Sequence, residues 1–80
     1  MTKQETITVI NSILRTYDYR TGSAQTGMRL FKDMVARVGR KDAGYVGHGS
    51  ADYFEYHIGG DKFRIIRDIR RNKWQIDTGV

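Results

Sequence analysis

Apolar and polar residues alternate with a period of two through the last third of the chain, and this pattern constrains the fold more than any other feature. The alternating segments are residues 52–58, 62–69 and 73–78. Gly59-Gly60-Asp61 separates the first two segments and Arg70-Arg71-Asn72 the last two, and both have turn composition. We therefore predict a three-stranded antiparallel meander, with Asn72 in the left-handed conformation.

The alternation also assigns the two faces of this sheet, because successive side chains of a strand point to opposite sides. We expect the helices to cover the apolar face, which carries Phe54, Tyr56, Ile58, Phe63, Ile65, Ile69, Trp74 and Ile76. The opposite, open face carries Tyr53, Glu55, His57, Lys62, Arg64, Ile66, Asp68, Lys73, Gln75 and Asp77. Arg67 does not fit, because strict alternation turns its charged side chain inward. A β-bulge, or a place at the exposed end of the strand, would resolve this conflict.

Two helices are predicted ahead of the sheet. The first covers residues 2–17, where Thr2 and Glu5 have the spacing of a capping box. Its apolar residues recur on one helical face: Ile7, Ile10, Ile13, Leu14 and Tyr17. The two helices are expected to form an antiparallel hairpin or an L-shaped pair.

The second helix is expected to begin between residues 24 and 28 and to end at Val38. Ser23 or Thr26 is its predicted N-cap, and Gly39 is its predicted left-handed C-cap. Residues 39–50 contain four of the nine glycines, and we expect them to form a flexible connection. The resulting order, two helices packed on one face of a three-stranded meander, is an α+β fold. With 80 residues, we expect a single domain over residues 1–80.

Composition excludes several classes of protein. Without cysteine there is no disulfide framework, no thiolate zinc site and no thiol nucleophile. Apolar runs of two or three residues cannot span a bilayer, so no membrane association is expected. No apolar signal core follows the first charged residue at the N-terminus, which favours a cytoplasmic protein.

Neither a cofactor nor a metal ion is expected. The glycine-rich segment 44–50 lacks the Gly-Lys-Ser/Thr ending of a phosphate loop, and it precedes a strand rather than a helix. The two histidines, His48 and His57, do not have a regular ligand spacing with Asp52 and Glu55.

Positive charge gathers in the second predicted hairpin. The chain has a net charge of +5 and an isoelectric point near 9.8. Residues 62–73 hold one acidic residue against six basic residues: Lys62, Arg64, Arg67, Arg70, Arg71 and Lys73. A second basic set lies on the helical layer: Arg29, Lys32, Arg37, Arg40 and Lys41. Of this set, Arg37, Arg40 and Lys41 join the hairpin residues as predicted partner contacts. We expect these residues to contact a partner that is nucleic acid, an acidic protein or a nucleoprotein complex. An ordinary solvated surface is the alternative.

The leading functional hypothesis is a small, non-enzymatic binding module that docks on nucleic acid or on a nucleoprotein complex. Size and charge are typical of accessory proteins of phages and mobile elements, and an inhibitor of the anti-CRISPR kind is one concrete version. This hypothesis requires the basic residues of the hairpin to form one surface that neighbouring carboxylates do not neutralise.

Two further hypotheses remain open. In a ribonuclease-type toxin, Tyr53, His57, Lys62 and Arg64 converge on the open sheet face for proton transfer and charge stabilisation. Segment 56–68 resembles the late hairpin of RelE-type toxins over less than a quarter of the chain. Those toxins begin with a strand, whereas this chain begins with a capped helix, so the chain is not assigned to that family.

In a homodimeric interaction domain, the aromatic residues Tyr45, Tyr53 and Trp74 form the seam, or the edge strand 73–78 pairs with a second copy.

Overall fold

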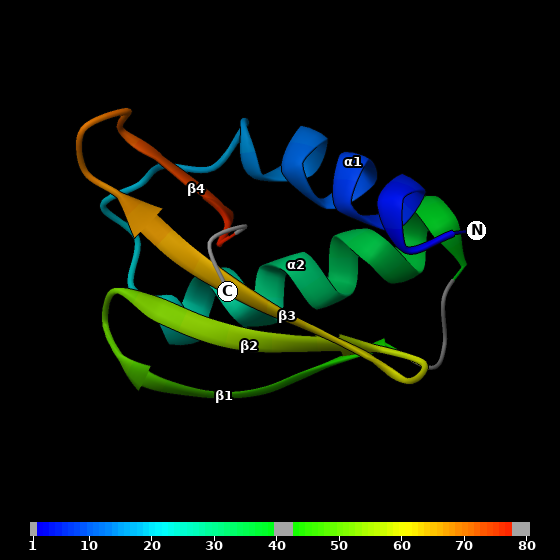
Figure 1. Cartoon of the computed structure of the whole chain (residues 1–80). Coiled ribbons are helices and arrows are strands. Elements are labelled where there is room, and N and C mark those ends of the chain that lie inside the picture. Colours follow the sequence, from blue (N-terminus) through cyan, green and yellow to red (C-terminus); the bar gives the residue numbers. More distant parts are fainter. Residues whose placement is uncertain (1, 40–42, 78–80) are drawn as a thin grey trace.

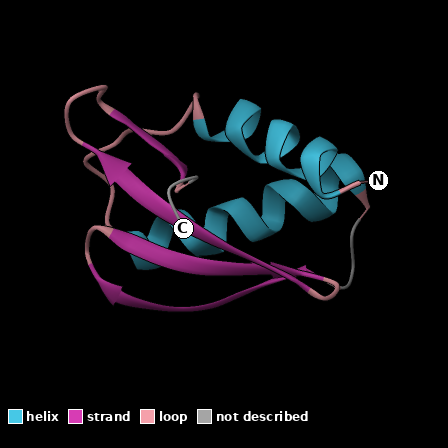
Figure 2. Ribbon diagram, viewed as in Figure 1, coloured by secondary structure: helices cyan, strands magenta, loops and turns pink. Residues whose placement is uncertain are grey.

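Four strands and two helices make up the computed structural model, which describes residues 2–39 and 43–77. The elements are α1 (Lys3–Leu14), α2 (Ser23–Val38), β1 (Ala43–Ser50), β2 (Tyr53–Ile58), β3 (Asp61–Asp68) and β4 (Lys73–Ile76). The strands form one antiparallel sheet in the order β1-β2-β3-β4, and both helices lie against one of its faces (Figures 1 and 2). The predicted α+β class and the meander of β2, β3 and β4 are confirmed.

The predicted capping box begins α1. The Thr2 hydroxyl accepts a hydrogen bond from the Glu5 backbone N–H at 3.1 Å, and the Thr2 N–H donates to the Glu5 carboxylate at 3.0 Å. These two bonds satisfy backbone donors that a helix start otherwise leaves to water. The helix ends at Leu14, three residues before the predicted end, yet Tyr17 is still buried beyond it.

The start of α2 differs from the prediction. Gly22 is the N-cap, and no side chain caps the helix. Ser23 and Thr26, the predicted caps, are buried and donate their hydroxyl hydrogens to backbone carbonyls outside the helix. The Ser23 hydroxyl bonds to the Ser50 carbonyl and so ties α2 to the end of β1. At the other end Gly39 is the predicted left-handed C-cap, with φ 70°, and α1 and α2 run roughly antiparallel (Figure 1).

The uncapped start of α2 offers a stabilising substitution. Gly22 has an extended backbone with φ −63° and ψ 157°, and a Cβ there would meet no atom within 4 Å. Gly22→Asp is expected to raise the free energy of unfolding by about 0.5–1 kcal/mol, because it adds a cap and a charge that favours the helix dipole. Urea denaturation measures the gain, and Gly22→Ala is the control. An equal gain from alanine would contradict the capping explanation.

Residues 43–50 form strand β1, so the prediction of a flexible connection is wrong for them; residues 40–42 lie outside the described part of the chain. β1 pairs with β2 from Ala43 opposite Ile58 to Ser50 opposite Tyr53, and the register shifts twice around Gly47. Glycine has low strand propensity, but the ladder to β2 satisfies its backbone, and glycine tolerates such irregularities. Pairing along an existing strand therefore decides the conformation here.

The apolar face of the sheet carries the core, as predicted. Phe54, Tyr56 and Ile65 are fully buried, and Trp74 is 1% exposed, with its ring centroid 5.7 Å from that of Phe54. α2 packs against β1 and β2, and α1 packs against β4. The assignment of Ile69 to this face is wrong: it lies in the turn after β3 and is 67% exposed. The pleat that turns alternate residues inward ends at Asp68.

Candidate functional site

Arg67, which the sequence placed among the partner-binding residues, points into the protein. It lies directly opposite Trp74 in an unbroken register, so neither a bulge nor a free strand end explains it. Its guanidinium donates to the carbonyls of Tyr19, Thr21 and Ala51. It also stands 3.1 Å from the Asp52 carboxylate and 5.0 Å from the centre of the Trp74 ring. Arg67 therefore clamps the loop after α1 and the β1–β2 turn onto the sheet, and only 13% of its side chain is exposed.

The other basic residues of the predicted hairpin do not form one surface. Lys62 and Arg64 project from the open face of β3, whereas Arg70 and Arg71 occupy the turn after it. Six residues of strand separate Lys62 from Asp68, the last residue before the turn, which corresponds to about 20 Å. Figure 1 shows the two ends of β3 on opposite sides of the molecule.

Carboxylates also interrupt the positive charge on the open face. Pairing across the strands places Glu55 opposite Arg64 and Asp68 opposite Lys73. The charged residues of β2, β3, β4 and Asp77 on this face number three basic and three acidic: Lys62, Arg64, Lys73, Glu55, Asp68 and Asp77. This part of the face is therefore close to neutral, so the requirement that the hairpin's basic residues form one surface free of neighbouring carboxylates is not met. An excess of positive charge is confined to smaller regions.

One such region is the β3–β4 turn, where we call Arg70, Arg71 and Lys73 the turn-end cations. Arg70 and Arg71 are exposed, and among the described residues neither Arg70 nor Lys73 has a carboxylate within ion-pair distance. Arg71 Nε lies 3.8 Å from Asp68, which also accepts a hydrogen bond from Gln75. Asn72 has φ 53°, the left-handed conformation that the sequence predicted, so the turn is tight. Two arginines in the turn and Lys73 at the start of β4 thus lie close together, and among the described residues Asp68 is the one carboxylate within ion-pair distance of any of them.

Of the basic residues predicted near the end of the second helix, the structure describes Arg37, which lies away from this turn. Arg37 is in the last turn of α2, where its charge acts on the Tyr17 hydroxyl rather than on the open face. Arg40 and Lys41 lie outside the described residues. Arg37 therefore does not extend the turn-end cations.

A second group on the open face brings together the residues of the ribonuclease hypothesis. We call Tyr53, Glu55, His57, Lys62 and Arg64 the open-face cluster. The Arg64 guanidinium lies 4.3 Å from the centre of the Tyr53 ring, and His57 Nε2 lies 3.7 Å from the Glu55 carboxylate. Lys62 stands opposite His57 on the neighbouring strand. The ribonuclease hypothesis named four of these residues; the sequence also placed Glu55 on the same face as His57, but that hypothesis gave Glu55 no role.

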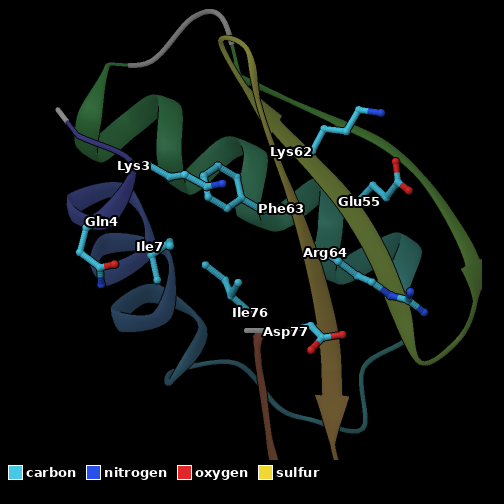
Figure 3. A pocket seen from close by; sticks show the side chains of 9 residues that line it. All are labelled: Lys3, Gln4, Ile7, Glu55, Lys62, Phe63, Arg64, Ile76 and Asp77. Carbon is cyan, nitrogen blue, oxygen red and sulfur yellow. The ribbon is translucent and has the colours of Figure 1, made fainter. Parts of the chain in front are cut away.

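A cleft of about 520 Å³ runs from the first turns of α1 across the edge of β3. Its apolar residues are Ile7, Phe63 and Ile76, and its polar rim includes Glu55, Lys62 and Arg64 from the open-face cluster. Figure 3 shows Lys62, Glu55 and Arg64 projecting to one side of β3, while Ile7 and Ile76 face each other on the other side. The cleft therefore adjoins the open-face cluster and gives it an apolar margin.

The predicted dimer seam loses one member, because Trp74 is buried in the core. The side chain of Tyr45 is not described, and Tyr53 is half-buried under Arg64. Pairing of β4 with a second copy remains a prediction that light scattering over a range of protein concentrations would test.

Comparison with known proteins assigns no function to these surfaces, so their chemistry is the basis for interpretation. No family model, curated protein or solved structure matches the chain. Within residues 2–39 and 43–77, no group of three or more metal-binding side chains occurs. Neither of the two described helices has the length and apolar character required to cross a membrane.

Proposed function

We propose that this protein is a small, non-enzymatic binding module that docks on nucleic acid through the turn-end cations. The observation that carries the proposal is the exposure of Arg70 and Arg71 in one tight turn, next to Lys73 and with Asp68 as the single acidic neighbour. Arginine and lysine at such a turn neutralise phosphates and release their counterions. Ile69, 67% exposed in the same turn, adds an apolar contact.

The same turn suits a nucleoprotein complex, in which phosphates are presented on a protein scaffold. An inhibitor of a nucleic-acid-guided defence complex, of the anti-CRISPR kind, would act in this way and in the cytoplasm. An acidic protein is the competing partner, and the experiment below separates it from nucleic acid.

The test is fluorescence anisotropy with a labelled single-stranded oligonucleotide, titrated at salt concentrations from about 50 to about 200 mM. For two or three phosphate contacts, the slope of log K against log salt is expected to be about −2 for a single strand. Arg70→Glu combined with Arg71→Glu is expected to weaken binding at least about tenfold and to flatten this slope. Binding that does not depend on salt, or the absence of binding to RNA, DNA and duplex alike, would overturn the proposal.

A matched control carries the same change in net charge on the helical layer. Lys32→Glu combined with Arg37→Glu alters two basic residues of α2 and leaves the β3–β4 turn intact. Binding should fall by less than about threefold, through the weaker long-range field alone. An equal loss in both double variants would show that overall charge, and not the turn, attracts the nucleic acid.

A ribonuclease is the second candidate, because the open-face cluster combines a His–Glu contact with two cations and a tyrosine. Its test is the integrity of labelled RNA after prolonged incubation with the protein, in EDTA. Cleavage that His57→Gln abolishes would establish the enzyme and overturn the non-enzymatic proposal. A toxin should also arrest growth when expressed, and Arg64→Ala should relieve the arrest.

A further inference from the structure

Two glycines of β1 stand next to the centre of the open-face cluster. Gly44 lies directly opposite His57, and Gly47 lies opposite Glu55. At the two positions of β1 that flank this His–Glu pair, the strand therefore carries no side chain. His57 and Glu55 thus lie between glycine positions of β1 on one side and Lys62 and Arg64 of β3 on the other.

Backbone geometry does not require glycine at position 44. The residues with positive φ in the described chain are Gly39, Gly59 and Asn72, so Gly44 has a conformation open to any residue. A Cβ at Gly44 would meet no atom within 4 Å, so packing does not require glycine either. Glycine inside a strand lowers its stability, and it often marks a bulge or a place where a ligand or another backbone approaches closely. The register shifts of β1 lie around Gly47, so no bulge accounts for Gly44. The space beside His57 thus suits a bound group.

The opposite side of the cluster is suited to an anion and to a planar group. Within the described part of the chain, neither Lys62 nor Arg64 has a carboxylate within ion-pair distance, and both side chains are exposed. The Arg64 guanidinium carbon lies over the Tyr53 ring, 4.3 Å from its centre, as in a cation–π contact. An unstacked base can stack on an exposed guanidinium or on an aromatic ring.

Glu55 restricts which anions fit. Its carboxylate repels a bare phosphate or sulfate, so a ligand must offer a hydrogen-bond donor to Glu55 as well as a negative group to Lys62 and Arg64. A nucleotide of single-stranded RNA provides all three groups: a phosphate, an unstacked base and a ribose 2′-hydroxyl. Single-stranded DNA lacks the hydroxyl, and a duplex keeps its bases stacked.

We propose that the open-face cluster and the two glycines of β1 bind one nucleotide of single-stranded RNA, with Glu55 accepting a hydrogen bond from the 2′-hydroxyl. The phosphate contacts Lys62, the base stacks on the Arg64–Tyr53 pair, and the sugar lies over the backbone at Gly44. This inference extends the proposed nucleic-acid binding to a second surface. The variants that test it, Gly44→Val and Glu55→Ala, leave the turn-end cations unchanged. Either proposal can therefore be contradicted while the other holds.

The first experiment blocks the site sterically. Gly44→Val places a branched side chain beside His57, where the sugar would lie. It is expected to weaken the binding of a labelled single-stranded RNA about tenfold, because the displaced sugar carries the base away from its stacking contact with Arg64 and Tyr53. Its melting temperature should equal that of the wild type or exceed it, since valine favours a strand. The control is Gly22→Ser, which also replaces a glycine but at the N-cap of α2, and it should leave RNA binding unchanged. A folded Gly44→Val protein with unchanged RNA affinity would overturn the proposal.

The second experiment compares RNA with DNA of the same sequence. The wild type is expected to prefer RNA about tenfold, which corresponds to one hydrogen bond to a charged group. Glu55→Ala should bring the ratio close to one, mainly because DNA affinity rises when the repulsion is removed. The double variant Arg70→Glu with Arg71→Glu should lower both affinities and keep the ratio. Equal wild-type affinity for RNA and DNA, or a ratio that Glu55→Ala leaves unchanged, would overturn the role of Glu55.

Discussion

Replacement of Arg67 by methionine is expected to lower the free energy of unfolding by about 3 kcal/mol. The guanidinium joins the Tyr19, Thr21 and Ala51 carbonyls and the Asp52 carboxylate, which come from two segments far apart in the sequence. Methionine fills a similar volume but has no hydrogen-bond donor. The three carbonyl oxygens and the carboxylate therefore lose the guanidinium that contacts them all. Urea denaturation followed by circular dichroism measures the loss.

Two further variants make this prediction specific. Arg67→Lys keeps the charge but not the planar fork that reaches several oxygens at once, so most of the loss should remain, at about 2 kcal/mol. Arg64→Met changes an exposed arginine of the same strand whose guanidinium lies over the Tyr53 ring, and it should cost less than about 1 kcal/mol. Equal losses for Arg67→Met and Arg64→Met would contradict the role of Arg67 as a clamp.

Tyr17→Phe is expected to cost about 2 kcal/mol at neutral pH. The Tyr17 hydroxyl donates a short hydrogen bond to the Asp33 carboxylate of α2 and so joins the end of the first helix to the second. Phenylalanine keeps the ring and its packing but leaves this half-buried carboxylate without its donor. Chemical denaturation of the two proteins side by side gives the difference.

The same contact predicts how stability depends on pH. Burial raises the pKa of Tyr17 above its ordinary value of 10.0, and the hydrogen bond to Asp33 and its negative charge act in the same direction. The folded state therefore holds the phenolic proton more tightly than the unfolded state. The stabilisation is fully present below pH 10 and is lost as the pH rises above it.

The measurement compares the two proteins from about pH 8 to about pH 11. The wild type should lose stability more steeply than Tyr17→Phe above pH 10, so that the difference between them narrows. Parallel pH profiles would show that the Tyr17 hydroxyl is not protected by Asp33. Asp33→Asn is a useful companion, because it keeps an acceptor and removes the charge that helps to raise the pKa of Tyr17.

Features that depend on a few neighbouring residues were predicted correctly. The Thr2–Glu5 capping box, the left-handed Gly39 and the left-handed Asn72 all occur where the sequence placed them. In each case the side chains or the backbone freedom that decide the conformation lie within three residues of each other. The alternation of apolar and polar residues in β2, β3 and β4 predicted the buried face equally well. A slip of one residue in the strand pairing would turn the apolar side chains to solvent, so a single register is favoured.

The positions that sequence reasoning missed depend on distant partners. Arg67 was placed in the partner-binding set because nothing nearby in the sequence shows the three carbonyls that surround it. The glycine-rich residues of β1 have weak strand propensity, and their conformation comes from pairing with β2. Ser23 has the composition of a helix cap but bonds to Ser50, which lies 27 residues later.

By itself, therefore, the sequence determined the two helices, the meander and the buried face, since these follow from local hydrogen bonds and from the period of apolar residues. Tertiary structure alone decided which charges remain available. It turned Arg67 inward, paired Arg71 with Asp68, and gathered Glu55, His57, Lys62 and Arg64 around bare strand backbone. The physical reason is that the interaction of two charges depends on their distance in space and on their burial, neither of which is a property of sequence spacing.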